Sequence, residues 1–183
     1  MKLLAGICCV MVAGISAVLG QAGAVPAEWI GTWTLSLPES KTGPIWGPGA
    51  PESSLTVISQ TLKIAAAAGH MKITDDTVIA GRGPSHGESD LDISRKETVI
   101  PGGATVSFKR FDDTAFDVIL SVNNKQLGNH VGENHFVFSG DGNTLTETKT
   151  HTEREVVPEG IDQTKGAVIR TSTSVLVFHK NLD

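Results

Sequence analysis

Four side chains that can bind a cation or transfer a proton alternate along one short segment, namely His86, Glu88, Asp90 and Asp92. Alternate residues of a β-strand lie on one face, so these four could converge on a metal ion or form an acid–base row. Leu91 occupies the opposite face together with Ile93, and both need the core. We therefore expect the acidic row to face solvent, with weak surface calcium binding as the alternative.

Two further histidines, His130 and His135, are an odd number of residues apart, so a regular strand puts them on opposite faces. They match no zinc motif. A single inward histidine could ligate haem iron or serve a barrel enzyme as acid or base. The sequence also lacks the Gly-x-Ser-x-Gly elbow of serine hydrolases. We expect neither an enzyme nor a cofactor, and we keep a barrel enzyme and a haem binder as lower alternatives.

The N-terminus has the composition of an export signal. Lys2 precedes an uncharged run over residues 3–20, and Ala22-Gly23-Ala24 then supplies the small residues that a signal peptidase reads. We expect cleavage after Ala24, with Val25-Pro26-Ala27 as a nearby alternative. A membrane anchor is the other interpretation, because the run approaches the length of a membrane span.

Both cysteines, Cys8 and Cys9, lie inside this signal segment, residues 1–24, so the exported domain at 25–183 would have no disulfide. The chain has a net charge of −5 and no cluster of Lys and Arg, which argues against binding to nucleic acid. We expect a periplasmic or extracellular protein that is a monomer and has no membrane span after processing.

The rest of the chain alternates short β-forming runs with turns rich in Gly, Pro, Asn and Asp. The clearest turn is Asp141-Gly142, a strong hairpin signal. No helical crossover separates the runs, so we predict an all-β fold: a single antiparallel up-and-down barrel of eight to ten strands. Asp75-Asp76 interrupts one run and could be a bulge or a tight turn.

Strand alternation predicts the lining of the barrel. Over residues 114–122 the apolar side chains Phe116 and Leu120 share one face, and Phe136 and Phe138 do so on a later run. Over residues 143–152 the two faces differ in another way, since one is threonine and the other holds charged residues. Because charged residues prefer water, we expect the threonine face, including Thr146 and Thr148, to line the interior. The alternative is that threonine is simply a good strand former.

A long loop rich in Pro and Gly, residues 38–52, carries Trp46. Long loops in compact domains are often lids or binding loops. We expect this loop to cap the open end, with Trp46 contacting a ligand. The alternative is that Trp46 pins the loop to the barrel wall.

The segment Trp29-Ile30-Gly31-Thr32-Trp33-Thr34-Leu35 resembles the opening of lipocalin-like (calycin-type) domains, in which Gly-x-Trp begins the first strand. The closing segment from Val175 to Lys180 is similar to the end of such domains, and the Asp141-Gly142 hairpin is similar to one in small exported bacterial members of undefined role. The lipocalin disulfide and second motif are absent. The resemblance implies that Lys180 packs across Trp33 next to Gly31 as a structural pairing.

Together these patterns favour an exported lipocalin-like protein that binds a small apolar or amphipathic ligand in its lumen. The main alternative is a structural or envelope-associated barrel whose core is filled by side chains, because the interior of an eight-stranded barrel can be fully occupied.

Overall fold

The computed structural model describes residues 24–44, 56–95, 97–100, 104–124, 128–158, 161 and 165–182. Its ten strands form one antiparallel sheet in the order β4-β3-β2-β1-β10-β9-β8-β7-β6-β5. Within these ranges, no helix has both the length and the apolar composition needed to cross a membrane. The strands and two short 3-10 helices are η1 (Ala27–Trp29), β1 (Gly31–Leu35), η2 (Leu37–Glu39), β2 (Val57–Ala67), β3 (His70–Ile79), β4 (Gly83–Asp92), β5 (Glu97–Ile100), β6 (Ala104–Arg110), β7 (Ala115–Asn124), β8 (Gly128–Phe138), β9 (Thr144–Arg154) and β10 (Val168–Lys180).

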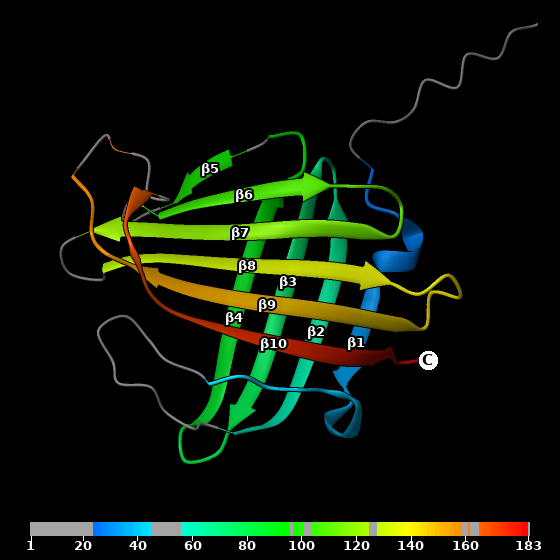
Figure 1. Cartoon of the computed structure of the whole chain (residues 1–183). Helices are drawn as coiled ribbons and strands as arrows, with labels where there is room; N and C mark the ends of the chain where they lie inside the picture. The colour runs from blue at the N-terminus through cyan, green and yellow to red at the C-terminus, as the bar shows by residue number, and fades with distance from the viewer. Residues whose placement is uncertain are drawn as a thin grey trace, which may run out of the picture.

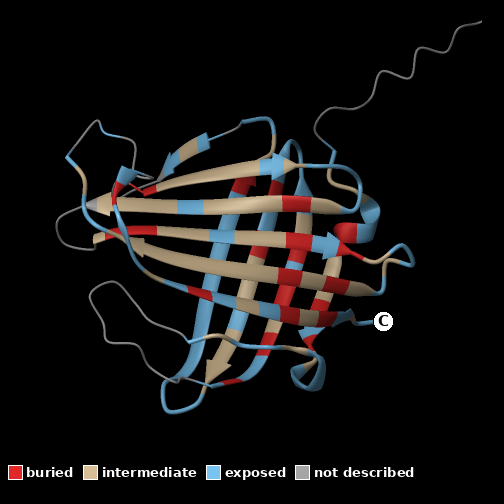
Figure 2. Cartoon of the chain, in the orientation of Figure 1, coloured by how far each residue is buried: buried red, intermediate tan, exposed pale blue. Residues whose placement is uncertain are grey.

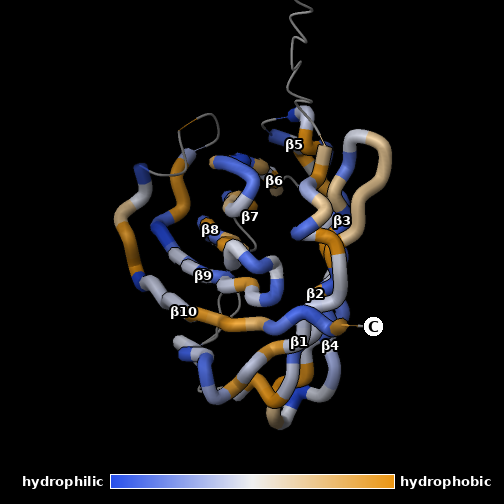
Figure 3. Tube along the Cα trace, turned by 90° about the vertical axis from the view of Figure 1, so that its right-hand side faces the viewer, coloured by the Kyte–Doolittle hydropathy of each residue, from blue (hydrophilic) through white to orange (hydrophobic). Residues whose placement is uncertain are grey.

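The sheet curls into a nearly closed barrel. In Figure 1, β5 to β10 run across the front and β1 to β4 cross behind them at a steep angle. The quarter-turned view of Figure 3 shows the strands arranged around a ring. The short strand β1 joins the two halves, because it pairs with β2 on one side and β10 on the other. The predicted up-and-down barrel is therefore confirmed, with ten strands.

The barrel is incomplete at one seam. Among the described strands, β4 and β5 form the two edges of the sheet and do not pair with each other. Here β4 approaches β6 instead. A cavity of about 120 Å³ remains at this seam, and its lining combines Leu91 of β4 with Val106 and Phe108 of β6 and with polar side chains such as Asp92, Arg95 and Thr98.

The core occupies one half of the barrel. In Figure 2 the buried segments of the front strands gather towards η1 and the C-terminus, and the other half is mostly intermediate or exposed. Trp29 of η1 closes this end, since its ring lies 4.6 Å from Phe116 and 5.4 Å from Phe138, measured between ring centroids. The Trp29 indole also donates a hydrogen bond of 2.8 Å to the Asp113 carbonyl. The barrel therefore has a packed end, and its hollow half lies beyond this end.

Gly31, Trp33 and Lys180, which the lipocalin-like resemblance singles out, lie together at this packed end. The Lys180 ammonium lies 5.0 Å from the centroid of the Trp33 ring and donates a hydrogen bond of 3.0 Å to the Glu28 carbonyl. Gly31 has φ of 150°, and a Cβ there would lie 2.7 Å from Lys180 Cε. This φ favours glycine, and a side chain at the position would also displace the lysine from the tryptophan.

The strands differ from the expected ones in two places. Asp75-Asp76 does not break the chain: β3 runs through it without a shift, and Asp75 pairs with Leu62 on one side and Gly87 on the other. The strand β5 was not predicted. The expected export signal falls outside the described residues except for Ala24, so its cleavage stays a prediction.

Candidate functional site

The register of β9 reverses the expected inward face. Phe136 pairs with Glu147 and Phe138 with Leu145, so the charged face of β9 shares the interior with the aromatic face of β8. Leu145 is fully buried, and Glu147 is 1% exposed. Thr146 and Thr148 therefore lie on the outer face of the barrel, and the prediction that they line the lumen was wrong. The cause is cross-strand packing, because directly opposed residues in an antiparallel pair share a face.

A sequence signal for this register was available. A hairpin turn centred on Asp141-Gly142 puts residues equally distant from it opposite each other, and this places Leu145 against Phe138. Once Phe138 was taken as inward, Leu145 had to be inward as well, together with the charged residues that alternate with it. The general preference of charged residues for water was the weaker guide here.

Two neighbouring cavities occupy the hollow half of the barrel. One, which we call the loop chamber, has a volume of about 310 Å³ and includes Thr42, Gln60, Gly132, His151, Ser172 and Ser174 in its lining. The other, the core chamber, has a volume of about 230 Å³ and includes Leu62, Ile73, Asp75, Val118, Phe136 and Glu147. Asn134 and Lys149 line both, so the two chambers meet at these side chains.

A cluster of charged side chains stands where the chambers meet. The Lys149 ammonium lies 3.4 Å from Glu147 Oε2 and 3.5 Å from Asp75 Oδ2. Asp75 also accepts a hydrogen bond of 2.9 Å from the Gln60 amide and one of 2.6 Å from the Thr77 hydroxyl. We call Asp75, Glu147 and Lys149 the lumen cluster. It joins two strands, β3 and β9, and Gln60 of β2 supports Asp75.

Burial and neighbouring charges shift the pKa of two members of the lumen cluster, Glu147 and Lys149. Burial raises the pKa of the Glu147 carboxyl above its usual 4.5; the Lys149 charge opposes this shift and the Asp75 charge adds to it. Burial alone would lower the pKa of Lys149, but the charges of Glu147 and Asp75 outweigh it, and the pKa is raised above 10.5. The Lys149 side chain is 31% exposed although protein surrounds it, because it borders the chambers. It is therefore a cation at neutral pH that faces the lumen.

A pair of histidines lies on the same inner surface. His130 Nδ1 is 3.0 Å from His151 Nε2, so one ring donates a hydrogen bond to the other. Burial lowers the pKa of His151, and the neighbouring His130 and Arg170 charges lower it further while Glu153 opposes them. The His151 ring is therefore favoured in the neutral form. Among the described residues, no three His, Asp or Glu side chains gather as a metal site would require.

The four predicted apolar contacts fall in different environments. Phe136 lines the core chamber. Phe116 and Phe138 pack against Trp29 at the closed end and are fully buried. Leu120 lies on the same face of β7 as Phe116 but is 43% exposed. The structure thus brings Phe136 to the lumen cluster, and ligand contact by all four stays a prediction.

The first part of the predicted binding loop docks beside the loop chamber. Lys41 bridges to Val175 on β10, and the Ser172 hydroxyl donates a hydrogen bond of 2.7 Å to the Pro44 carbonyl. Thr42 and Pro44 line the chamber. Trp46 lies outside the described residues, so its contact with a ligand stays a prediction.

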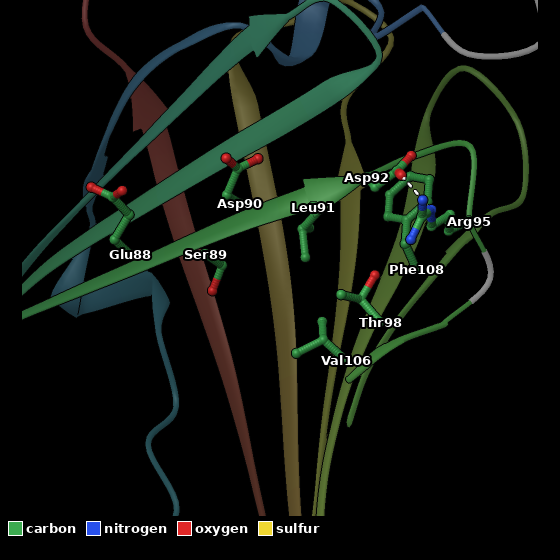
Figure 4. Close-up of a pocket in the computed structure, with 9 residues that line it drawn as sticks. All are labelled: Glu88, Ser89, Asp90, Leu91, Asp92, Arg95, Thr98, Val106 and Phe108. Carbon is green, nitrogen blue, oxygen red and sulfur yellow. Dashed lines mark ion pairs between the residues drawn. The ribbon is translucent and has the colours of Figure 1, made fainter. Parts of the chain in front are cut away.

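The acidic row of β4 faces solvent, as expected. Figure 4 shows Glu88 and Asp90 pointing away from Ser89 and Leu91. Each partner lies on the neighbouring strand β3: Lys72 is 2.7 Å from Glu88, His70 is 2.9 Å from Asp90 and Asp76 is 2.6 Å from His86. These are exposed ion pairs, which stabilise a protein by at most about 1 kcal/mol each.

The two histidines that sequence reasoning singled out separate as predicted. His130 is inward and buried, whereas His135 lies on the outer face, where its ring is 2.6 Å from an Asp117 carboxylate oxygen. The lumenal residues that sequence reasoning missed are Gln60, Asp75, Glu147, Lys149 and His151.

The chain matches no protein-family model, and a search of curated proteins finds no relative. Two solved structures are similar in shape, each 10% identical in sequence. One is EF1p2_mFAP2b bound to DFHBI, with a TM-score of 0.43 over 84% of this chain and 94% of the other. The second is a mutant of the fluorescent protein UnaG, with a TM-score of 0.45 over 85% and 98%. Likeness at this level carries no argument about function, which therefore depends on the geometry of the lumen.

Proposed function

We propose that this chain is an exported barrel that binds a small amphipathic molecule in its two chambers. The observation that carries the proposal is the lumen cluster, where two carboxylates and an ammonium border a hollow interior. Taking the Glu147 carboxylate out of water costs several kcal/mol, which its long contact with Lys149 does not recover. An apolar filling would stabilise the barrel better, so the cluster is most easily explained by binding.

The two chambers together suit a molecule with unlike ends. Leu62, Ile73, Val118 and Phe136 offer an apolar wall in the core chamber. The loop chamber offers hydroxyls and amides, from Gln60, Asn134, Ser172 and Ser174. Pockets with apolar walls and a few converging polar groups are the usual form of small-molecule sites.

Gly132 provides a direct test. It lines the loop chamber, and a Cβ built there meets only the Leu120 carbonyl, at 3.9 Å. Gly132→Leu should therefore fill the chamber without strain. Gly140 lies in the Asp141-Gly142 turn, where a Cβ would meet nothing within 4 Å, so Gly140→Leu is the matched control.

Native mass spectrometry of the purified protein, with solvent extraction of bound material, should detect a small molecule in the wild type and the control. The amount of bound molecule should be at least about tenfold lower in Gly132→Leu. A wild-type protein that carries no small molecule and binds none in titrations would instead favour the structural barrel.

Export is a separate part of the proposal and is supported by the composition of residues 1–24. N-terminal sequencing of protein recovered outside the cytoplasm should begin at Val25. A chain that keeps Met1 and stays inside the cell would contradict it.

A further inference from the structure

The lumen cluster leaves hydrogen-bonding capacity unused. Among the described residues, Glu147 Oε2 is a buried atom with no hydrogen-bond partner. Its contact with the Lys149 ammonium, at 3.4 Å, is longer than the ~2.7–2.9 Å of a charge-assisted hydrogen bond. The second contact of the ammonium, with Asp75 Oδ2, is also long at 3.5 Å. A buried acceptor without a hydrogen-bond partner therefore lies at the edge of a cavity, beside an ammonium whose two contacts are both long.

The charges around this position select the head group that completes it. Two carboxylates face one ammonium, so a ligand carboxylate would add a third negative group beside Glu147. A ligand ammonium would lie close to Lys149 and would offer it no acceptor. A hydroxyl can serve both Glu147 and Lys149, since it donates one hydrogen bond and accepts another. The raised pKa of Glu147 agrees with this, because burial disfavours further charge there.

The surroundings select the rest of the molecule. Leu62, Ile73, Val118 and Phe136 line the core chamber next to Glu147. These side chains offer no hydrogen bonds, so they suit a hydrocarbon body. A hydroxyl bound to the lumen cluster would therefore place the rest of the molecule against this apolar wall.

We propose that the lumen takes an apolar alcohol, whose hydroxyl donates to Glu147 Oε2 and accepts from the Lys149 ammonium. This inference rests on the proposed binding function and narrows it to one class of head group. It makes Glu147 the residue that discriminates against carboxylates, and Lys149 the residue that fixes the hydroxyl.

Three ligands that share one hydrocarbon chain test the head group alone: 1-decanol, decanoate and decylamine. Isothermal titration of the purified wild-type protein with each, at neutral pH and one salt concentration, should give the tightest binding for 1-decanol. We expect a preference over decanoate of at least about tenfold. This comparison needs no variant, so it does not depend on whether a mutant folds.

Variants then assign the preference to the cluster. Glu147→Gln keeps the size of the side chain and removes its charge, so the preference for 1-decanol over decanoate should shrink to within about threefold. Glu133→Gln is the matched control, because Glu133 is exposed on the outer face of β8. Lys149→Met should weaken the binding of 1-decanol. It should bind decanoate no more tightly than Glu147→Gln does. Circular dichroism confirms that each variant is folded before it is titrated.

The outcomes separate the two proposals. A preference for 1-decanol that shrinks in Glu147→Gln and persists in Glu133→Gln supports the inference. Equal or tighter binding of decanoate or decylamine by the wild type overturns it and leaves the proposed function standing. A preference that is unchanged in a folded Glu147→Gln protein also overturns it. If none of the three ligands binds, and native mass spectrometry finds no bound molecule, both proposals are wrong.

Discussion

Replacement of Trp33 by alanine tests how the closed end of the barrel is held together. Trp33 is 0% exposed, its ring centroid lies 5.4 Å from that of Phe138, and its indole donates a hydrogen bond of 3.2 Å to the Trp29 carbonyl. Burial of a Trp side chain removes ~150–250 Å² from water, which at ~25 cal/mol per Å² is worth about 4–6 kcal/mol. Alanine retains part of this area, so we expect Trp33→Ala to lower the free energy of unfolding by about 3–5 kcal/mol.

Thermal and urea unfolding, followed by circular dichroism, measure this loss. In a domain of this size 1 kcal/mol corresponds to about 2–4 °C, so the melting temperature should fall by roughly 6–20 °C. Phe111→Ala is the matched control, because Phe111 is 48% exposed, and it should cost less than about 1 kcal/mol. If Trp33→Ala melts within about 2 °C of the wild type, the packed end described above is wrong.

Three further predictions concern residues beside this core or in the lumen. Gly31→Ala should lower stability by about 1–3 kcal/mol in urea unfolding, because φ is unfavourable and Lys180 must leave Trp33; an unchanged midpoint would contradict this. The pKa of His151 is lowered in the folded protein, so the stability that its neutral form gives above pH 6.5 should be lost as the pH falls below this value. In parallel melts at pH 7 and pH 5, the melting temperature of His151→Gln should therefore fall less than that of the wild type. Equal falls in the two proteins would refute this prediction. The pKa of Glu147 is raised in the folded protein, so its contribution to stability is present below pH 4.5 and is lost as the pH rises through the raised value. Glu147→Gln should therefore be at least as stable as the wild type at pH 8. A clearly lower unfolding midpoint for the variant would refute this prediction.

The fold was predictable because the sequence carries its signals locally. Asp141-Gly142 fixes a hairpin, and the apolar alternation around Phe116 identifies an inward face without reference to other strands. The acidic row of β4 was oriented correctly by the same logic, since Leu91 occupies its other face and is buried.

The lumen was harder to predict because its polar residues look like surface residues. Glu147 and Lys149 are inward because the aromatic residues of β8 set the register of β9, a contact between strands that composition does not reveal. Asp75 looked like part of a break because its partner Gln60 lies 15 residues away on another strand. Buried charges follow from pairing across the barrel, and pairing is a property of the folded chain.

A crystal structure of the purified protein grown with 1-decanol tests the central claim most directly, namely that the barrel holds a small molecule beside the lumen cluster. We expect density for an apolar chain against Leu62 and Phe136, with its oxygen within hydrogen-bond distance of the Lys149 ammonium and Glu147 Oε2. A lumen filled by side chains alone, or decanol bound only on the outer surface with Lys149 turned to solvent, would contradict it.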